Sequence, residues 1–551
     1  MIRSLLAGLL LISQTTVAAT LVHNVRGYTM NDGEVVRFVG LEFDGGTVTR
    51  LHTDQASIDA SAADEKVDWG GATLLPGLID AHGHVSSHGR ALSSVDLVAV
   101  GSEADAVERV RMFAAANAGD GWITGRGWNQ VLWPGRAFPD RRSLDALGDR
   151  PIALGRIDGH ALWVNSRALS LAGIDDDTAD PEGGQIIRDA SGRATGVLID
   201  NAMDMVFEAM PADTDDLIAD FQELALKDLA AHGVTSVHDA GISAQELRAF
   251  DALLAADRMP VRVYAMLDVL DPANDGTLAA GPRADAAGML VVRSVKISAD
   301  GALGSRGAAL FDDYHDEPGH KGLLLLSDKD LRHHMNRAVD AGFQVNTHAI
   351  GDLANDRVLS EYERLNGETS SRALRHRVEH AQILRPKDVQ RFAAAGVIAS
   401  VQPTHATSDK NMAGDRLGEK RLEAAYAWHT LLASGARLAG GSDFPVESVN
   451  PFFGLHAAVT RQGQDNRPPE GWLPGEKLDR AESLSLFTEG AAYASHQEDL
   501  IGKLLPGFSA DFILVRDDYF EVAEEQLWSN AVLATYVAGK RVFSAADGAD
   551  E

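Results

Sequence analysis

The sequence predicts an α/β protein: a TIM-like (β/α)8 barrel with a small β-sandwich built from both ends of the chain. Between residues 74 and 499, short apolar segments alternate with amphipathic helical patterns, as expected of a closed parallel sheet. Residues 20–73 and 500–546 carry short alternating runs separated by glycine turns, which are typical of antiparallel strands. Residues 90–213 break the alternation and predict a folded insertion between the first two barrel strands.

The first 19 residues have the pattern of a cleavable signal peptide. Arg3 precedes a short apolar run, and Val17-Ala-Ala19 offers the small residues of a cleavage site. The run is too short to span a membrane, and the sequence contains no second candidate span. We therefore expect a periplasmic or secreted protein without a stable membrane anchor.

The two chain ends are expected to pair with each other, because neither can bury much apolar surface alone. The N-terminal part contributes runs such as residues 34–40, and the C-terminal part contributes residues 511–515, 531–537 and 541–543. Together they predict one β-sandwich.

The barrel is predicted from eight strand and helix units. Residues 215–231 form an amphipathic pattern, Ser327 begins a capping box, and Pro386 suits the first turn of another helix. The expected barrel strands are residues 74–79, 234–237, 261–267, 291–297, 343–346, 375–378, 397–401 and 437–440.

The predicted insertion is rich in tryptophan: Trp122, Trp128, Trp133 and Trp163. Two interpretations stay open here. The insertion is either a subdomain that covers the substrate or a subdomain that takes no part in substrate binding.

Composition excludes several functions. A formal net charge of -30 argues against nucleic acid as a partner, because phosphate binding needs a basic surface. The chain has no cysteine, which rules out disulfides, thiolate metal ligands and a cysteine nucleophile. A metal would have to be held by histidine, carboxylate or a modified side chain. The sequence carries no signal of oligomeric state, and the small-molecule substrate that we expect is implied by the family resemblance described below.

Histidines follow the first predicted barrel strand. His82 and His84 are two positions apart, so on a strand both side chains point to the same side and can share one metal ion. By itself this pair could be two solvated loop residues. Active sites of such barrels lie at the C-terminal strand ends, however. The other strand ends carry further candidates: Lys296, His348, His380 and Asp443.

Five motifs carry a family resemblance. They are Leu75-Pro-Gly-Leu-Ile-Asp-Ala-His-Gly-His84 and residues 296–306, 346–352, 377–380 and 441–445. The chain resembles the amidohydrolase superfamily, and within it the YtcJ-like, or amidohydrolase-3, branch. The resemblance implies metal-dependent hydrolysis on the predicted barrel.

The resemblance also implies ligand roles. His82 and His84 would hold the more buried metal, completed by Asp443, and His348 and His380 would hold a second. Zinc is expected first, since neutral imidazole binds it well, although manganese, iron or cobalt would suit the same ligands.

Lys296 would bridge both ions as a carbamate formed with carbon dioxide. An ammonium group about 4 Å from a divalent ion is repelled by roughly 8 kcal/mol at an effective dielectric near 20, so this lysine must lose its charge or move away. The alternative is an unmodified Lys296 with one metal.

The implied reaction uses a metal-bound hydroxide to cleave a C–N bond, an amide or N-acyl group, with Asp443 as the proton carrier. An ester or lactone hydrolase could use the same site. A third possibility is an exported binding or regulatory protein on a scaffold that has lost catalysis.

Four further residues are candidate substrate contacts. Arg306 could pair with a substrate carboxylate or anchor its loop through Asp300. Trp128 and His160 could line the pocket or belong to the core of the insertion, and His405 could touch substrate or act as a gate.

Overall fold

The computed structural model describes residues 19–545, apart from 158–159 and 182, so the predicted signal segment lies outside the described residues except for its last position. The chain divides into two compact units. Unit 1 comprises the residues up to His84, Leu226–Leu247, and the chain from Leu254 onward. Unit 2 comprises Val85–Ala225 and Arg248–Leu253.

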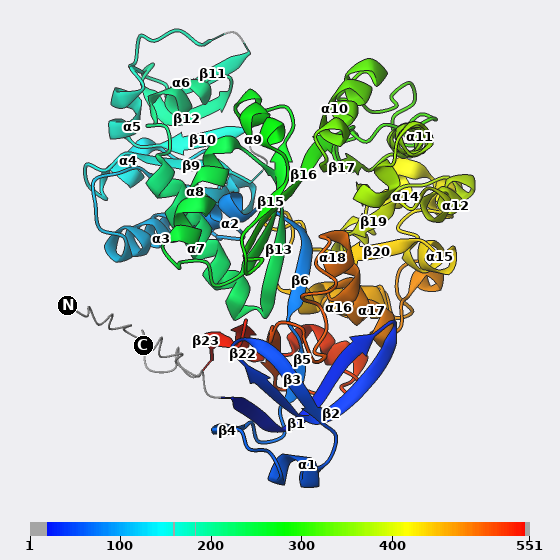
Figure 1. Cartoon of the computed structure of the whole chain (residues 1–551). Helices are drawn as coiled ribbons and strands as arrows, with labels where there is room; N and C mark the ends of the chain where they lie inside the picture. Colours follow the sequence, from blue (N-terminus) through cyan, green and yellow to red (C-terminus); the bar gives the residue numbers. More distant parts are fainter. Residues whose placement is uncertain (1–18, 158–159, 182, 546–551) are drawn as a thin grey trace, which may run out of the picture. The chain divides into compact units, whose positions relative to one another are not determined.

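A parallel barrel is the centre of unit 1 and confirms the predicted fold class (Figure 1). Every neighbouring pair along the path is parallel. A parallel bridge between Gly83 and Phe444 closes it beyond the last strand. In order round the barrel, the strands are β6 (Leu78–Gly83), β13 (Val234–Ile242), β14 (Arg262–Asp268), β16 (Leu290–Ser298), β17 (Gln344–Ala349), β18 (Arg377–His380), β19 (Ile398–Val401) and β20 (Arg437–Gly440).

The helices between the strands follow the sequence signals. Ser327 caps α10 by accepting a hydrogen bond from the backbone of Asp330, and Pro386 opens α12, which ends at Gly396 with φ of 66°. The helices that follow the barrel strands and the last ones of the chain are α7 (Asp215–Ala231), α8 (Ala244–Ala255), α9 (Asp275–Ala280), α10 (Asp328–Asp340), α11 (Asp352–Glu368), α12 (Pro386–Ala395), α13 (Pro403–Asp409), α14 (Ala413–Leu417), α15 (Trp428–Ala433), α16 (Pro451–Thr460), α17 (Arg480–Leu486) and α18 (Glu489–Ala494).

The first predicted barrel strand, residues 74–79, is divided between two sheets. β5 (Thr73–Pro76) belongs to the terminal sheet, and β6 begins after Gly77. A Cβ at Gly77 would lie 2.2 Å from the Thr235 hydroxyl oxygen, so only glycine fits at the crossing point. One apolar run thus connects the barrel to the sandwich.

The predicted strand 375–378 begins two residues later, as β18. Arg375 follows a short 3-10 helix (Ser371–Leu374) and has φ of 56°, a left-handed conformation that a strand cannot continue. The shift places Glu379 and His380 inside the strand.

Both chain ends form one eight-stranded sheet around a shared core, as predicted. The strand order is β23-β22-β21-β5-β1-β2-β3, and β4 pairs with β1. Phe43 and Phe512 pack with ring centroids 5.8 Å apart, which joins the N-terminal and C-terminal strands in one core. The remaining strands are β1 (Thr20–Asn31), β2 (Glu34–Asp44), β3 (Thr47–His52), β4 (Glu65–Asp68), β21 (Phe512–Val515), β22 (Val532–Val537) and β23 (Lys540–Ser544).

Unit 2 includes all described residues of the predicted insertion 90–213 and has its own six-stranded sheet. Trp128, Trp133 and Trp163 pack against one another in its core, with ring centroids 6.0–6.4 Å apart. Its elements are α2 (Val85–Leu92), β7 (Val95–Asp96), α3 (Glu103–Ala116), β8 (Ile123–Trp128), α4 (Arg141–Asp145), β9 (Ile152–Arg156), β10 (Ala161–Val164), α5 (Ser166–Leu171), β11 (Gly184–Arg188), β12 (Ala194–Asp200) and α6 (Asp204–Ala209).

Within the described residues, none of the helices combines the length and the apolar character that crossing a bilayer requires.

A buried ion pair ties barrel strand β14 to the terminal sheet. Arg262 donates from Nε to Asp511 at 2.6 Å and from Nη2 to both Asp511 and Ser509, at 3.2 and 2.8 Å. Both charged side chains are almost fully buried. Because the pair is bidentate and supported by a further bond from the Ala538 backbone at 2.7 Å, its charges are well compensated.

Asp511→Asn should lower the free energy of unfolding by about 3–5 kcal/mol, because it leaves the Arg262 guanidinium buried without a counter-charge. The measurement is urea denaturation of the purified protein. Asp517→Asn is the matched control, since its pair with Arg516 is exposed and should change stability by about 1 kcal/mol at most. Equal effects of the two substitutions would contradict the structural role of the buried pair.

Candidate metal centre

The structure gathers the predicted ligands at one end of the barrel. Each lies at or just beyond the C-terminal end of its strand, which is the end where barrel enzymes carry their active sites. They are His82 on β6, His84 after β6, Lys296 on β16, His348 on β17, His380 on β18 and Asp443 after β20.

Asp443 is the meeting point of the first group. Its Oδ1 lies 3.1 Å from His84 Nε2 and 3.6 Å from His82 Nε2. On the other side of His82, the same Nε2 lies 3.2 Å from Lys296 Nζ. Atoms of four side chains from three separate strands therefore surround one small volume.

Barrel closure brings these groups together. The backbone N–H of Asp443 donates to the His82 carbonyl at 2.7 Å, and the backbone N–H of His84 donates to the Phe444 carbonyl at 2.9 Å. Asp80, fully buried, accepts from the His82 backbone at 3.1 Å and from the Ser442 backbone and hydroxyl at 3.0 and 2.6 Å. One carboxylate therefore holds the first and last strands together.

Two glycines allow the close approach of these segments. A Cβ at Gly83 would lie 2.1 Å from the Phe444 ring, and one at Gly441 would lie 2.6 Å from the His82 backbone nitrogen. The glycine between His82 and His84 is thus required by packing against the last barrel segment.

Glu379 fixes the orientation of His82 and was not given a role in the sequence prediction. Its Oε2 lies 2.6 Å from His82 Nδ1, and both side chains are fully buried. Since a carboxylate only accepts, Nδ1 carries the proton and Nε2 presents its lone pair to the centre. Glu379 stands beside a predicted ligand in the sequence, but its partner is almost 300 positions away.

His380 is oriented in the same way. Its Nδ1 lies 2.7 Å from the side-chain oxygen of Gln402, whose amide donates to the Ser400 carbonyl at 3.3 Å. The ring of His380 lies 4.9 Å from that of His82 and 4.5 Å from that of His348, between centroids.

His348 directs its Nε2 toward Asp300 and not toward Asp443. Its Nε2 lies 3.4 Å from Asp300 Oδ1 and makes no hydrogen bond within the described residues. Asp300 is itself fixed by the backbones of Ala309, Ile350 and Gly351, at 2.8, 3.0 and 2.8 Å.

Burial favours the neutral forms of two of the histidines and of Lys296, whereas Asp443 stays ionised. It lowers the pKa of His82 and of His380 well below the usual range, and neighbouring Lys296 and His348 add to the effect. It also lowers the pKa of Lys296, although Glu379 and Asp443 oppose the shift. For Asp443, burial raises the pKa, but the hydrogen bond from His84 and the nearby histidines leave it well below its usual range.

Two predicted ligands have unusual backbone conformations. Asp443 has φ of 64° and His380 has φ of 76°, in the left-handed region that side chains other than glycine rarely occupy. Such positions cost about 1–3 kcal/mol each and are common at functional sites.

The donor set fits a divalent ion. The ligand atoms of His82, His84 and Asp443 lie within 4.8 Å of one another, and those of His380, His405 and Asp443 form a second such group. Imidazole and carboxylate donors of this kind suit zinc and its neighbours among the transition metals.

Of the four candidate substrate contacts, His405 and Arg306 lie in unit 1. His405 Nε2 is 3.5 Å from Asp443 Oδ2. Arg306 forms a two-pronged pair with Asp316, at 3.2 and 2.9 Å, and its Nε lies 3.2 Å from Glu317. The guanidinium is thus paired within its own loop, through Asp316 and Glu317.

The other two lie in unit 2. Trp128 is fully buried and donates from its ring nitrogen to the Leu154 carbonyl at 2.7 Å. His160 is exposed, and its Nδ1 lies 2.8 Å from Asp200.

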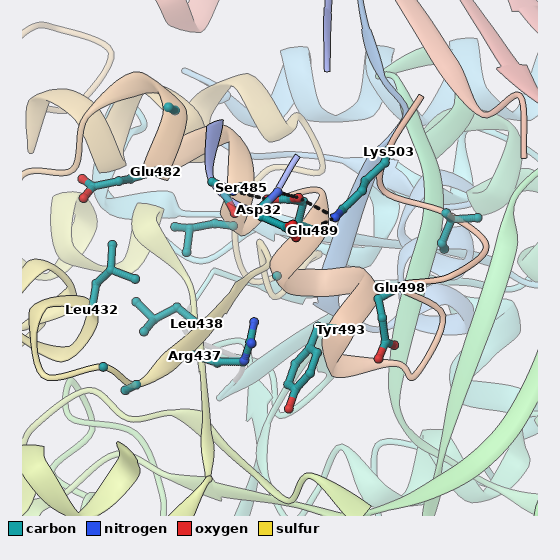
Figure 2. Close-up of a pocket in the computed structure, with 17 residues that line it drawn as sticks. Asp32, Leu432, Arg437, Leu438, Glu482, Ser485, Glu489, Tyr493, Glu498 and Lys503 are labelled. Atoms are coloured by element: carbon teal, nitrogen blue, oxygen red, sulfur yellow. Dashed lines mark hydrogen bonds and ion pairs between the residues drawn. The ribbon is translucent and has the colours of Figure 1, made fainter. Parts of the chain in front are cut away.

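A separate hollow of about 800 Å³ lies at the opposite, N-terminal end of β20 (Figure 2). Arg437, Leu438 and Tyr493 line it, and Lys503 there pairs with Asp32 and Glu489 at 3.2 and 3.1 Å. The predicted metal ligands are not among its lining residues, so it is distinct from the histidine cluster.

Comparison with known proteins yields matches over almost the whole chain. The sequence profile described as "Amidohydrolase family" matches residues 65–543. A protein named Putative amidohydrolase YtcJ, from Bacillus subtilis, is 33% identical over 488 residues, which cover 87% of this chain and 90% of that protein. N-substituted formamide deformylase of Arthrobacter pascens is 28% identical over 515 residues, covering 90% and 93%.

Among solved structures, an uncharacterized metal-dependent hydrolase from Pyrococcus furiosus superposes with a TM-score of 0.76 at 28% sequence identity. The match covers 91% of this chain and 100% of that one.

Glu379→Gln should weaken metal binding by about 10–100-fold, because it removes the charge that orients His82 and raises its basicity. Metal affinity would be measured by competition with a chromogenic chelator. Glu42→Gln offers a matched control, since Glu42 contacts the buried His52 at 3.1 Å in the terminal sheet. Wild-type affinity in Glu379→Gln would show that this carboxylate has no part in metal binding.

Proposed function

The chain belongs to the amidohydrolase family, in its YtcJ-like branch, and on that basis we propose that this metal-dependent hydrolase cleaves a C–N bond, an amide or N-acyl group, of a small molecule. One observation carries the proposal: His82, His84, Lys296, His380 and Asp443 converge at the C-terminal end of the barrel. For His82 and His380, burial and the hydrogen bonds at Nδ1 favour a neutral imidazole whose Nε2 can bind a metal.

A bound divalent ion lowers the pKa of a water molecule and polarises a carbonyl, which removes the need for a side-chain nucleophile. Zinc is the ion we propose. Asp443, with a pKa well below its usual range, is ionised at neutral pH and can accept the proton of the attacking water. It then gives this proton to the leaving nitrogen, which is too basic to leave as an anion.

Lys296 is proposed to react with carbon dioxide and to serve as a bridging carbamate. Burial lowers its pKa, which favours the neutral amine that attacks carbon dioxide. Its Nζ already lies 3.2 Å from His82 Nε2, within reach of the proposed ligand set.

The choice of a C–N bond is supported by the relative named N-substituted formamide deformylase, which is similar over 90% of this chain. Export by residues 1–19 is also part of the proposal and is supported by the sequence pattern alone.

The test of function is a substrate panel with matched amide, ester and lactone versions of the same acyl group, including N-substituted formamides and N-acyl amino acids. The metal-loaded protein should hydrolyse amides with the higher kcat/KM. A preference for esters or lactones would assign the site to the other hydrolase class. Full metal loading with no turnover on any member would favour a binding protein.

Asp443→Asn should keep most of the metal held by His82 and His84, because one amide oxygen remains as a ligand, and should lower kcat by about 10²–10⁴-fold, because the amide cannot accept the proton. Metal content and turnover would be measured on the same preparation. Asp518→Asn serves as the control, since Asp518 is a buried carboxylate that accepts from Tyr28 at 2.8 Å in the terminal sheet. Turnover at the wild-type rate in Asp443→Asn would remove its proposed proton-transfer role.

Lys296→Ala should lose metal and activity, and acetate or propionate should partly restore both, since a small carboxylate can occupy the place of the carbamate. Activity would be followed against carboxylate concentration. Lys503→Ala is the control, because Lys503 pairs with Asp32 outside the ligand cluster, and this variant should neither lose activity nor gain it from added carboxylate. A fully active Lys296→Ala would contradict the bridging role.

A further inference from the structure

The two oxygens of Asp443 face different sets of histidines. Oδ1 approaches His84 and His82, at 3.1 and 3.6 Å. Oδ2 instead lies 3.5 Å from Nε2 of His405, a residue on the short helix α13 just beyond β19. A single carboxylate therefore connects the first pair of ligands to a histidine outside the ligand set that the family resemblance implies.

His405 presents an unsatisfied nitrogen to this centre. Its Nε2 is buried and makes no hydrogen bond within the described part of the chain, although buried polar atoms are nearly always paired. The side chain is only 12% exposed, and its ring stacks on that of His380 at 5.8 Å between centroids with 15° between planes. Such a nitrogen, aimed at a carboxylate and beside a second imidazole, is suited to a cation.

His380 is prepared to share that cation. The Gln402 side-chain oxygen accepts a hydrogen bond from Nδ1–H of His380 at 2.7 Å, so Nε2 of His380 offers a lone pair. Gln402 cannot reverse this arrangement without losing the bond from its amide to the Ser400 carbonyl.

The distances between the ligand atoms of these three side chains suit a single ion that all three share. Ligand atoms of His380, His405 and Asp443 all lie within 4.8 Å of one another. Two donors bound at about 2.1 Å in a tetrahedral site are roughly 3.4 Å apart, which is close to the 3.5 Å between His405 and Asp443.

We propose that His405 is a ligand of a second divalent ion, which it holds together with His380 and Asp443. The assignment rests on the proposed metal-dependent function and adds to it a ligand from the helix that follows the seventh barrel strand. His348, whose Nε2 is directed at Asp300, belongs to neither of the two groups of ligand atoms. Asp443 would then connect both ions, one through each oxygen.

The test is a metal titration of the purified full chain after removal of metal by a chelator. Zn²⁺ or Co²⁺ would be added, and stoichiometry, affinity and the visible absorption of bound Co²⁺ would be recorded. The wild type should bind two ions. His405→Ala should retain the ion of His82 and His84, bind the second at least about tenfold more weakly, and lose part of the Co²⁺ spectrum.

Two further variants make the result specific. His405→Asn keeps a polar side chain but lacks an imidazole nitrogen. If His405→Ala does not fold, the metal titration of His405→Asn tests the proposal in its place. His320→Ala is the matched control, because His320 is also partly buried, with its Nε2 3.0 Å from a backbone carbonyl, yet lies outside both groups of ligand atoms. It should bind both ions as the wild type does.

The proposal is overturned if the wild type binds only one ion, or if both His405 variants bind two with unchanged affinity and Co²⁺ spectrum, even where hydrolysis falls. Hydrolysis by the wild type is measured separately on the substrate panel. A protein that binds two ions but cleaves nothing would contradict the proposed function and leave the role of His405 intact.

Discussion

The contact between the end of β6 and the segment after β20 is the constraint on which the centre depends. Asp80 lies inside this contact and accepts three hydrogen bonds, one from the His82 backbone on its own strand and two from Ser442 that join the first strand to the last barrel segment. Burial raises the pKa of Asp80 to about 6 although these bonds oppose the shift. Burying the Asp80 carboxylate is therefore unfavourable, but its hydrogen bonds hold the first and last barrel segments in a fixed register. That register brings His82 and His84 to Asp443.

One carboxylate and one amide side chain determine which ring nitrogen of two imidazoles carries the proton and which faces the centre. Glu379 and Gln402 accept hydrogen bonds from Nδ1–H of His82 and His380, so both rings present Nε2 to the same volume. Burial keeps these rings neutral, since an imidazolium there would lack solvation. Orientation and protonation therefore come from residues that do not themselves belong to the predicted ligand set, and the ligands are positioned before any ion arrives.

The sequence was sufficient for the barrel, the joined chain ends and the grouping of candidate ligands at one rim, because strand periodicity and the fixed direction of parallel strands determine them. It could not predict the break at Gly77, which depends on Thr235 in another strand. It also missed the late start of β18, where a left-handed Arg375 ends a 3-10 helix. Glu379, Gln402 and the approach of His405 to Asp443 depend on contacts across the barrel, which no local pattern records.

The division of one apolar run between β5 and β6 also bears on the order of assembly. β5 pairs with β21, in which Leu75 lies opposite Ile513, so the strand that leads to the first two histidines pairs with a strand far along the sequence. During synthesis β21 leaves the ribosome long after β5. Pairing of β5 is consequently a late event, and a translation product truncated before β21 would carry the first two histidines without the strand that pairs with β5.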